Sequence, residues 1–333
     1  MKNLISTIAY CVLFSIARSN AQTPGAIEQV ESVQQRRQLD SAANSQQEGE
    51  NAPELFPGES SDVGPQSVLR FKPRKTWFEA FADVQYFYTD NMFLTENNEQ
   101  SSDVLVSSAQ FALAPTPPAA LGGGQLAPRL GYRHQWFDYG LAGGTVNHST
   151  FKLNEFDFNA QTAFADGQWT HGNWVVDAGF DFTRLMDTAK YDEFYKEYVP
   201  HWGVQRLFPL SAAGALALGY AGDYRFTDAT VPFFVASDFN DRTDHSLFAA
   251  YIATLCKHAV VQPFYRFKYT HFTTGADRSD YLNSFGVAVH YFFTPQISLR
   301  AFVNYDIRDS SNSAVPDYNK LDTGGGVNLL VKF

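Results

Sequence analysis

The stretch Leu321–Phe333, which reads LDTGGGVNLLVKF, is the starting point for the fold. Every second residue counted back from Phe333 is apolar or small, and the residues between them are mostly polar or small. The first set is Val331, Leu329, Val327, Gly325, Thr323 and Leu321. A repeat of two residues is that of a β-strand with different surroundings on its two faces. An edge strand of a soluble sheet has the same pattern, so the upstream sequence must separate the two.

Alternating segments recur along the chain, each about as long as a tilted strand needs to cross a bilayer, roughly 9–11 residues or somewhat more. In one of them, Leu299 and Val303 share a face opposite Arg300. We place twelve strands, near residues 77–89, 103–114, 127–138, 154–166, 174–185, 194–208, 214–226, 244–256, 260–272, 281–293, 297–308 and 320–333. Pro200 in the sixth removes a ladder hydrogen bond and predicts a bulge.

The connections between these strands alternate in length. The long ones cover residues 90–102, 139–153, 186–193, 227–243, 273–280 and 309–319; the others are short, apart from the Pro- and Gly-rich residues 115–126. A membrane barrel has short turns at one end, longer loops at the other and aromatic residues at both strand ends. We therefore predict an all-β, transmembrane, antiparallel up-and-down β-barrel of about twelve strands, residues 77–333, with a disordered or partly helical N-terminal tail.

The terminal aromatic with alternate apolar residues before it resembles the closing strand of bacterial outer-membrane barrels. In that class such residues, here Phe333, Val331 and Leu329, serve as the assembly signal. The resemblance implies insertion by the barrel-assembly machinery into the outer membrane of a Gram-negative cell, in contact with lipid and lipopolysaccharide, as a monomer or an oligomer.

The N-terminal residues have a different composition. Lys2, an apolar run and Ser19-Asn20-Ala21 predict a secretory signal peptide, residues 1–21, which leaves Cys256 as the single cysteine of the mature chain. Residues 22–76 are rich in Gln, Glu, Ser and Pro, and we interpret them as a periplasmic low-complexity tail or linker. A short helix with Ile27, Val30 and Val33 on one side is expected within it, and insertion of the tail into the barrel as a plug is the alternative.

Charged residues on the face opposite the apolar one are expected to line the lumen, because lipid disfavours an Arg or Lys at mid-depth by roughly 2–4 kcal/mol. The expected lumen-lining residues are Glu79, Asp83, Arg129, Arg133, Asp157, Asp177, Asp181, Asp223, Arg225, Arg266, Lys268, Arg300 and Asp306. Either a water-filled channel or a closed network of ion pairs would accommodate them.

The segment Tyr86–Leu94, YFYTDNMFL, is similar to the start of the β-barrel porin family 2, in which an aromatic first strand runs into an Asp-Asn pair and then an aromatic residue. Tyr88, Asp90, Asn91 and Phe93 match that motif, and Met92 stands where an aliphatic Ile or Val is expected. The resemblance implies an outer-membrane barrel, in some members associated with exopolysaccharide or envelope systems. Turn formation explains Asp90 and Asn91 better than calcium binding does.

No set of residues predicts an enzyme, a cofactor or a metal site. The adjacent pairs His148-Ser149 and His245-Ser246 would point to opposite faces of a strand and could not share a proton. The other histidines are scattered, the Gly-rich runs are not followed by a phosphate-binding helix, and no basic patch predicts nucleic-acid binding.

The expected function follows from the barrel and its charges. The net charge is −10, and the negative charges gather in the long connections. We expect a porin-like channel for passive diffusion of small polar solutes or ions. The alternative is a non-channel envelope barrel that anchors, or assists the export of, an exopolysaccharide or another envelope polymer.

Overall fold

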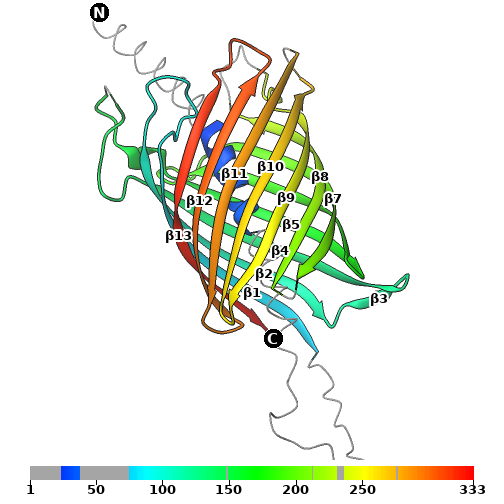
Figure 1. Ribbon diagram of the computed structural model, residues 1–333. Coiled ribbons are helices and arrows are strands. Elements are labelled where there is room, and N and C mark those ends of the chain that lie inside the picture. Colours follow the sequence, from blue (N-terminus) through cyan, green and yellow to red (C-terminus); the bar gives the residue numbers. More distant parts are fainter. Residues whose placement is uncertain (1–23, 38–74, 148, 212, 231–235, 275–276) are drawn as a thin grey trace, which may run out of the picture.

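The computed structural model describes residues 24–37 and 75–333, apart from residues 148, 212, 231–235 and 275–276. Twelve antiparallel strands close into a barrel, and a helix of residues 24–37 lies inside the ring of strands (Figure 1). The predicted fold class is thus confirmed. The expected signal peptide and residues 38–74 lie outside the described residues, so their assignments stay predictions.

The twelve barrel strands lie close to the predicted positions. They are β1 (Thr76–Thr89), β2 (Ser102–Thr116), β4 (Gly124–Tyr139), β5 (Phe158–His171), β6 (Trp174–Asp187), β7 (Glu193–Ser211), β8 (Gly214–Ala229), β9 (Arg242–Cys256), β10 (Ala259–Phe272), β11 (Arg278–Phe292), β12 (Ile297–Ser310) and β13 (Tyr318–Lys332). A short extra strand, β3 (Ala119–Leu121), forms a hairpin with the start of β4. The turn between them contains Gly122 and Gly123, whose φ angles of 58° and 80° favour glycine.

Each of the twelve barrel strands pairs with the barrel strand before it and the one after it, β2 pairing directly with β4, and β1 pairs with β13 to close the barrel. The chain enters β1 and leaves β13 at one end, which we call the C-terminal end. The opposite, long-loop end carries the connections of residues 90–101, 140–157, 188–192, 230–241, 273–277 and 311–317. Connections of two to four residues join most strands at the C-terminal end, as a membrane barrel requires.

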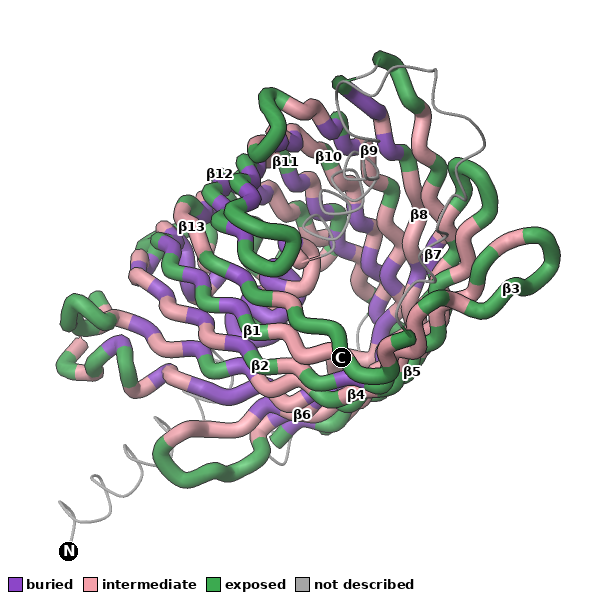
Figure 2. The backbone as a smooth tube through the Cα atoms, turned by 90° about the horizontal axis from the view of Figure 1, so that it is seen from below, coloured by how far each residue is buried: buried purple, intermediate pink, exposed green. Residues whose placement is uncertain are grey.

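Burial alternates along the strands, as the colours of Figure 2 show. In β12, Leu299 and Val303 are exposed on the outer surface, whereas Arg300 and Asp306 are buried on the inner one. Apolar side chains thus face outward, and charged side chains face the lumen. This is the arrangement that a lipid environment outside the barrel requires.

Strand β5 departs from the predicted alternation. Thr162 is buried and shares a hydrogen bond of 3.0 Å with Thr183 across the inner surface, whereas Ala163 is exposed outside. The expected start of this strand instead forms the 3-10 helix η1 (Leu153–Phe156). The sequence misleads here because the inner wall of β5 is apolar, so the expected position of Asp157 on the lumen face is wrong. Asp157 precedes β5 and accepts a hydrogen bond of 2.7 Å from the backbone N–H of Tyr139.

The bulge expected at Pro200 is also absent from the described strands. Tyr198 pairs with Phe226 and His201 with Asp223, so the register with β8 is unchanged across Pro200. A register shift occurs instead at Pro209, next to the turn into β8. A proline that lacks one ladder bond can evidently be accommodated while the strand stays in register.

Contacts at both ends hold the β1–β13 seam. At the C-terminal end, the carbonyl of Phe333 accepts hydrogen bonds of 3.1 and 3.0 Å from the N–H groups of Trp77 and Phe78, and its ring lies 6.0 Å from that of Phe78. At the long-loop end, the carboxylate of Asp90 accepts a hydrogen bond of 2.7 Å from the N–H of Leu321. Asn91 donates to the carbonyl of Asn319 at 3.0 Å.

Replacing Phe333 by Asp should lower the amount of protein inserted in the outer membrane, because the charge would replace the ring that packs on Phe78 and Phe111. Phe293→Asp is the matched control, since Phe293 is an exposed aromatic in a turn at the same end but away from the seam. Heat-modifiable mobility of membrane fractions on gels measures the folded amount. Equal insertion of both variants would show that Phe333 acts only as a strand end.

Candidate functional site in the barrel lumen

The helix of residues 24–37 is enclosed by the barrel. All its residues except Pro24 are buried or half-buried, and Val33 has no exposed surface. Its N-terminal end contacts the loops of the long-loop end, and its C-terminal end points towards the other end of the barrel. Residues 24–37 therefore occupy the lumen, where the plug alternative placed the tail, and the interpretation of the rest of residues 22–76 as a periplasmic tail or linker stays a prediction. No helix among the described residues has the length and apolarity needed to span a membrane.

One side of the helix packs on an apolar wall. Ala26, Ile27, Val30 and Val33 belong to one buried cluster with inward-facing side chains of β1, β2 and β4 to β7. These include Phe87, Val104, Val106, Phe137, Tyr139, Phe158, Ala160, Leu185 and Tyr195. Full burial of an aliphatic side chain contributes about 1.5–3 kcal/mol relative to exposure. The apolar wall thus stabilises the docked helix and explains why β5 turns an apolar face inward.

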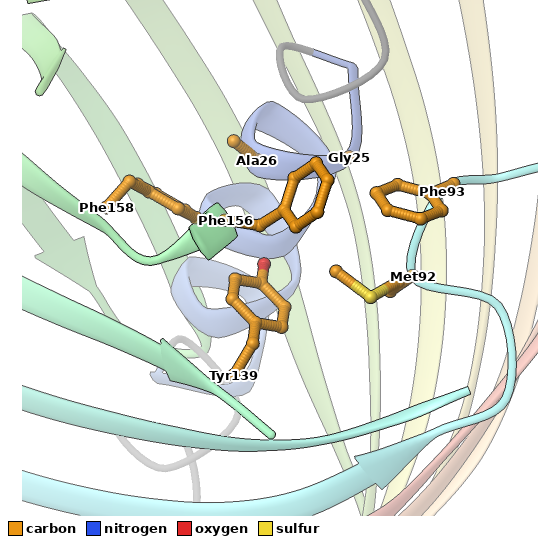
Figure 3. A pocket seen from close by; sticks show the side chains of 7 residues that line it. All are labelled: Gly25, Ala26, Met92, Phe93, Tyr139, Phe156 and Phe158. Carbon is orange, nitrogen blue, oxygen red and sulfur yellow. The ribbon is translucent and has the colours of Figure 1, made fainter. Parts of the chain in front are cut away.

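The helix begins in a small apolar pocket formed by the loops of the long-loop end (Figure 3). Met92, Phe93 and Phe156 line it together with Tyr139, Phe158 and the first turn of the helix. A Cβ atom at Gly25 would lie 2.6 Å from the carbonyl oxygen of Met92. Only glycine allows this close approach without displacing the loop, so residue 25 fixes how deeply the helix end sits.

The opposite side of the helix carries Glu31, whose carboxylate is held by three cations from neighbouring strands. Its Oε1 lies 3.1 Å from the guanidinium of Arg225 and 2.5 Å from that of Arg242, and its Oε2 lies 2.7 Å from Nζ of Lys268. The four side chains are about nine-tenths buried. Charge-assisted hydrogen bonds of this kind are stronger than neutral ones. We call Arg225, Arg242 and Lys268 the carboxylate cradle.

Acidic residues of the barrel wall hold the cradle in place. Arg225 is 2.9 Å from Asp223 and 3.2 Å from Glu197, and Arg242 is 3.3 Å from Asp244. Because these partners stand on β7, β8 and β9, the cradle arginines are positioned by the barrel itself. The helix supplies only the last carboxylate.

A second contact anchors the other end of the helix. The guanidinium of Arg36 lies 4.5 Å from the ring centres of both Phe87 and Phe302 and 3.4 Å from Asp322. Such stacking of a cation on aromatic faces contributes about 0.5–2 kcal/mol. Gly324 is the strand partner of both Phe87 and Phe302, and a Cβ atom there would collide with the Cβ of Phe87. The glycine run of β13 thus makes room for this sandwich.

The predicted lumen-lining residues other than Asp157 lie on the inner surface and fall into two groups. Arg225, Lys268, Asp223, Arg266, Asp83, Arg300 and Asp306 belong to the walls around the helix or to the networks beside it. Arg266, for instance, donates to Gln35 of the helix at 2.9 Å. The sequence is compatible with a water-filled channel or with a closed network of ion pairs. The ion-pair network is present in this part of the lumen.

The second group lies towards the C-terminal end, mainly on β4 to β6. Arg129 is 3.8 Å from Glu79 and 4.0 Å from Asp166, and its side chain is 38% exposed. Asp181 lies 3.6 Å from His201, and Asp177 and Arg133 are half-buried. The paired atoms lie farther apart than in a hydrogen bond, and the side chains are partly exposed. This arrangement is expected of a water-filled lumen. The two halves of the lumen therefore differ in character.

Several residues of the site were missed by the sequence analysis. Glu31 and Arg36 were assigned to a tail, and Arg242 was assigned to a loop because β9 was predicted to begin two residues too late. Lys320, which is 3.4 Å from Asp306 and 3.6 Å from Asp322, was also left out. The helical spacing of Ile27, Val30 and Val33 predicted the helix itself, and the presence of Glu28 and Glu31 beside this apolar face is the signal that could have indicated charged partners for it.

The motif residues have structural partners at the long-loop end. Asp90 and Asn91 make the seam contacts described above, Asn91 also accepts a hydrogen bond of 3.0 Å from the N–H of Thr95, and the Phe93 ring meets that of Phe156 edge-on at 4.9 Å. The exposed Tyr88 points outward. These contacts agree with turn formation. No cluster of metal-ligating residues occurs within the part of the chain that the structure describes.

Of the two adjacent His-Ser pairs, only His245-Ser246 lies wholly within the described residues. His245 shares a hydrogen bond of 2.7 Å with the hydroxyl of Tyr220 and stacks near Tyr269. His148 lies outside the described residues.

Comparisons with known proteins identify the fold. An outer membrane channel from Pseudomonas putida F1 is 10% identical, with 82% of this chain and 100% of that chain aligned and a TM-score of 0.52. The β domain of the Bordetella autotransporter BrkA is 13% identical, with 78% and 100% aligned and a TM-score of 0.47. The KdgM porin in complex with disordered oligogalacturonate is 12% identical, with 75% and 98% aligned and a TM-score of 0.37.

At these identities the likeness concerns the fold alone, and it is to an outer-membrane β-barrel. No protein-family model matches the chain, and no curated protein matches it. The resemblance to the β-barrel porin family 2 therefore stays a prediction.

The apolar face of the helix generates a first prediction for the site. Val30→Asp would bury a charge against the apolar wall and should release the helix, whereas Gln34→Asp, at a half-buried position, is the matched control. Ser32→Cys in a Cys256→Ser background reports docking through its reaction with a membrane-impermeant thiol reagent. We expect the labelling rate to rise at least tenfold with Val30→Asp only. Equal rates in both variants would contradict packing on this wall.

The dependence of docking on pH follows from Glu31. Burial raises the pKa of its carboxyl, but Arg225, Lys268 and Arg242 outweigh this, and the pKa lies well below the ordinary value of 4.5. A lowered carboxyl pKa gives stabilisation that is complete above the ordinary value and is lost as the pH falls through the lowered one. The effect of pH on the ionisation of the thiol itself is measured with an undocked variant and divided out. The corrected rate of thiol labelling of docked Ser32→Cys should stay unchanged from pH 7 to pH 5. Release of the helix at pH 5 would contradict this pairing.

Proposed function

We propose that the protein is a channel of the bacterial outer membrane for small polar solutes and ions, and that the helix of residues 24–37 closes it. The lumen conducts when the helix leaves the cradle and the apolar wall. The helix thus acts as a gate, and passage through the open barrel is passive.

The docking of Glu31 in the carboxylate cradle carries this proposal. A buried ion pair gives little net stability, because desolvation of the charges offsets their attraction. It does specify one position, since removing either partner leaves an unpaired buried charge. A contact of this kind suits a helix that must fit in one place and still be released. An inert core would be filled more simply by apolar side chains.

The inner surface supports small polar solutes as the cargo. Towards the C-terminal end, Arg129 and Arg133 of β4 stand beside Asp166, Asp177 and Asp181 of the neighbouring strands β5 and β6, on a partly exposed inner surface. A wall with both signs of charge holds water and attracts polar solutes of either sign. It offers no continuous apolar path for a lipid-like molecule.

A non-channel envelope barrel is the second candidate function, and a separate observation favours it. The docked helix is enclosed around its circumference, so the lumen is obstructed at that level. In that role the helix would stay docked and brace the barrel, while other parts of the chain would contact an envelope polymer.

Conductance of purified protein in planar bilayers tests the proposal. Glu31→Gln leaves the three cradle cations without their carboxylate in the docked state, which disfavours docking by about 3–5 kcal/mol. We expect open events to become roughly a hundredfold to a few thousandfold more frequent. Glu28→Gln is the matched control: it makes the same change on the same helix, where Glu28 has one contact of 3.7 Å with Lys320.

The two functions give different results. A channel gated by the helix shows rare discrete openings in the wild type and frequent ones with Glu31→Gln, with little change for Glu28→Gln. Wild type and Glu31→Gln that both stay silent, although folded by gel mobility, would overturn the channel and support the envelope barrel.

A further inference from the structure

We infer that the carboxylate cradle is a binding site for amphipathic organic acids, and that Glu31 occupies it as a built-in competitor. The ligand would place its carboxylate among Arg225, Arg242 and Lys268 and its apolar body against the inner wall of β4 to β7. This inference deepens the proposed function, because the ligand reaches the cradle only when the helix withdraws.

The cradle is a preformed site for a carboxylate. Its three donors lie 3.1, 2.5 and 2.7 Å from the two oxygens of Glu31, so both oxygens of one carboxylate are satisfied. Asp223, Glu197 and Asp244 belong to the barrel and position the arginines whether or not the helix is present. A site whose donors need no rearrangement binds its ligand with little loss of entropy.

The apolar wall begins next to the cradle, at β7. The hydroxyl of Tyr195 donates to Glu197 at 2.9 Å, and that carboxylate pairs with Arg225 of the cradle. The Tyr195 side chain belongs to the same buried cluster as Phe158 and Phe137, whose rings stack at 4.4 Å. When Ile27 and Val30 leave this cluster, an apolar surface is exposed beside three cations. That combination fits a molecule with one carboxylate and one apolar body.

The loss of a charged acceptor also favours an anionic ligand. In the docked state Glu31 is the fourth carboxylate near the cradle cations, together with Asp223, Glu197 and Asp244. Loss of Glu31 leaves one carboxylate fewer in a site that is shielded from bulk water. A monoanionic ligand returns the charged acceptor that the cradle donors lose with Glu31, whereas a neutral amide of the same shape does not.

The experiment uses full-length Ser32→Cys protein in the Cys256→Ser background, and its readout is the rate of thiol labelling in the helix. The probes are hydrocinnamate, propionate, which lacks the aromatic body, and hydrocinnamide, which lacks the charge. A ligand that binds only the undocked state raises that rate by a factor of 1 + [L]/Kd, about tenfold at nine times Kd. We expect this rise with hydrocinnamate at a concentration where the other two probes leave the rate unchanged.

A second measurement uses the Glu31→Gln channel, in which the competitor is absent. Hydrocinnamate should reduce its conductance, and Lys268→Met in that background should weaken the block at least tenfold. Arg129→Gln is the matched control, because it removes a cation of the partly exposed group near the C-terminal end. Its block should equal that of the parent.

The outcomes separate the inference from the proposed function. If Glu31→Gln opens the channel but hydrocinnamate acts no differently from propionate or hydrocinnamide, the ligand site is wrong and the gated channel stands. Equal weakening of the block by Lys268→Met and Arg129→Gln would also overturn the site, since the acid would then bind the lumen charges at large. Silence of the Glu31→Gln channel would overturn the proposed function itself.

Discussion

The pairing of the Glu31 carboxylate with three cations of β8, β9 and β10 constrains the whole interior. A closed barrel of twelve strands leaves an interior that side chains must fill or water must occupy. Here one helix fills the half of the interior at the long-loop end. That helix is amphipathic, and the wall around it is divided in a similar way: most of the apolar cluster stands on β1, β2 and β4 to β7, and the three cations that meet Glu31 stand on β8, β9 and β10. Rotation of the helix about its axis would place Glu31 on phenylalanine rings and Val30 on arginines. The ion pairs therefore set the orientation, and the apolar cluster supplies most of the burial.

Most of the fold could be predicted because lipid imposes a simple rule on every strand. The alternation of outward apolar residues and inward charged ones located eleven strands to within a few residues, and the lengths of the connections gave the two ends. The rule failed at β5, where Phe158, Ala160 and Thr162 face inward. When the inner face of a strand packs on an apolar helix, both of its faces can be apolar. Hydropathy alone then does not distinguish the inner face from the outer one.

The site was harder to predict, because half of it comes from a segment that reads as a polar linker. Arg225, Lys268 and Arg266 could be placed on the lumen face by counting in twos, but their partners could not. Glu31 lies about two hundred residues away in sequence, and its pairing depends on where the helix sits. Local pattern gives the direction in which a side chain points; it does not give the distant group that the side chain meets.

The covalent connection between the helix and β1 has a kinetic consequence. The residues between Arg37 and Lys75 could extend over roughly 120 Å, several times the thickness of about 30 Å of a bilayer core. The connection therefore keeps the helix on the same molecule as the lumen, but its length does not limit the displacement of the helix to the thickness of the bilayer. A segment tethered to its own site competes at an effective concentration that belongs to one molecule and not at the concentration of a second molecule in solution. A solute that uses the same cradle must exceed a threshold to keep the lumen free. When the solute is depleted, the segment returns at a rate that does not depend on how many copies of the protein the membrane contains.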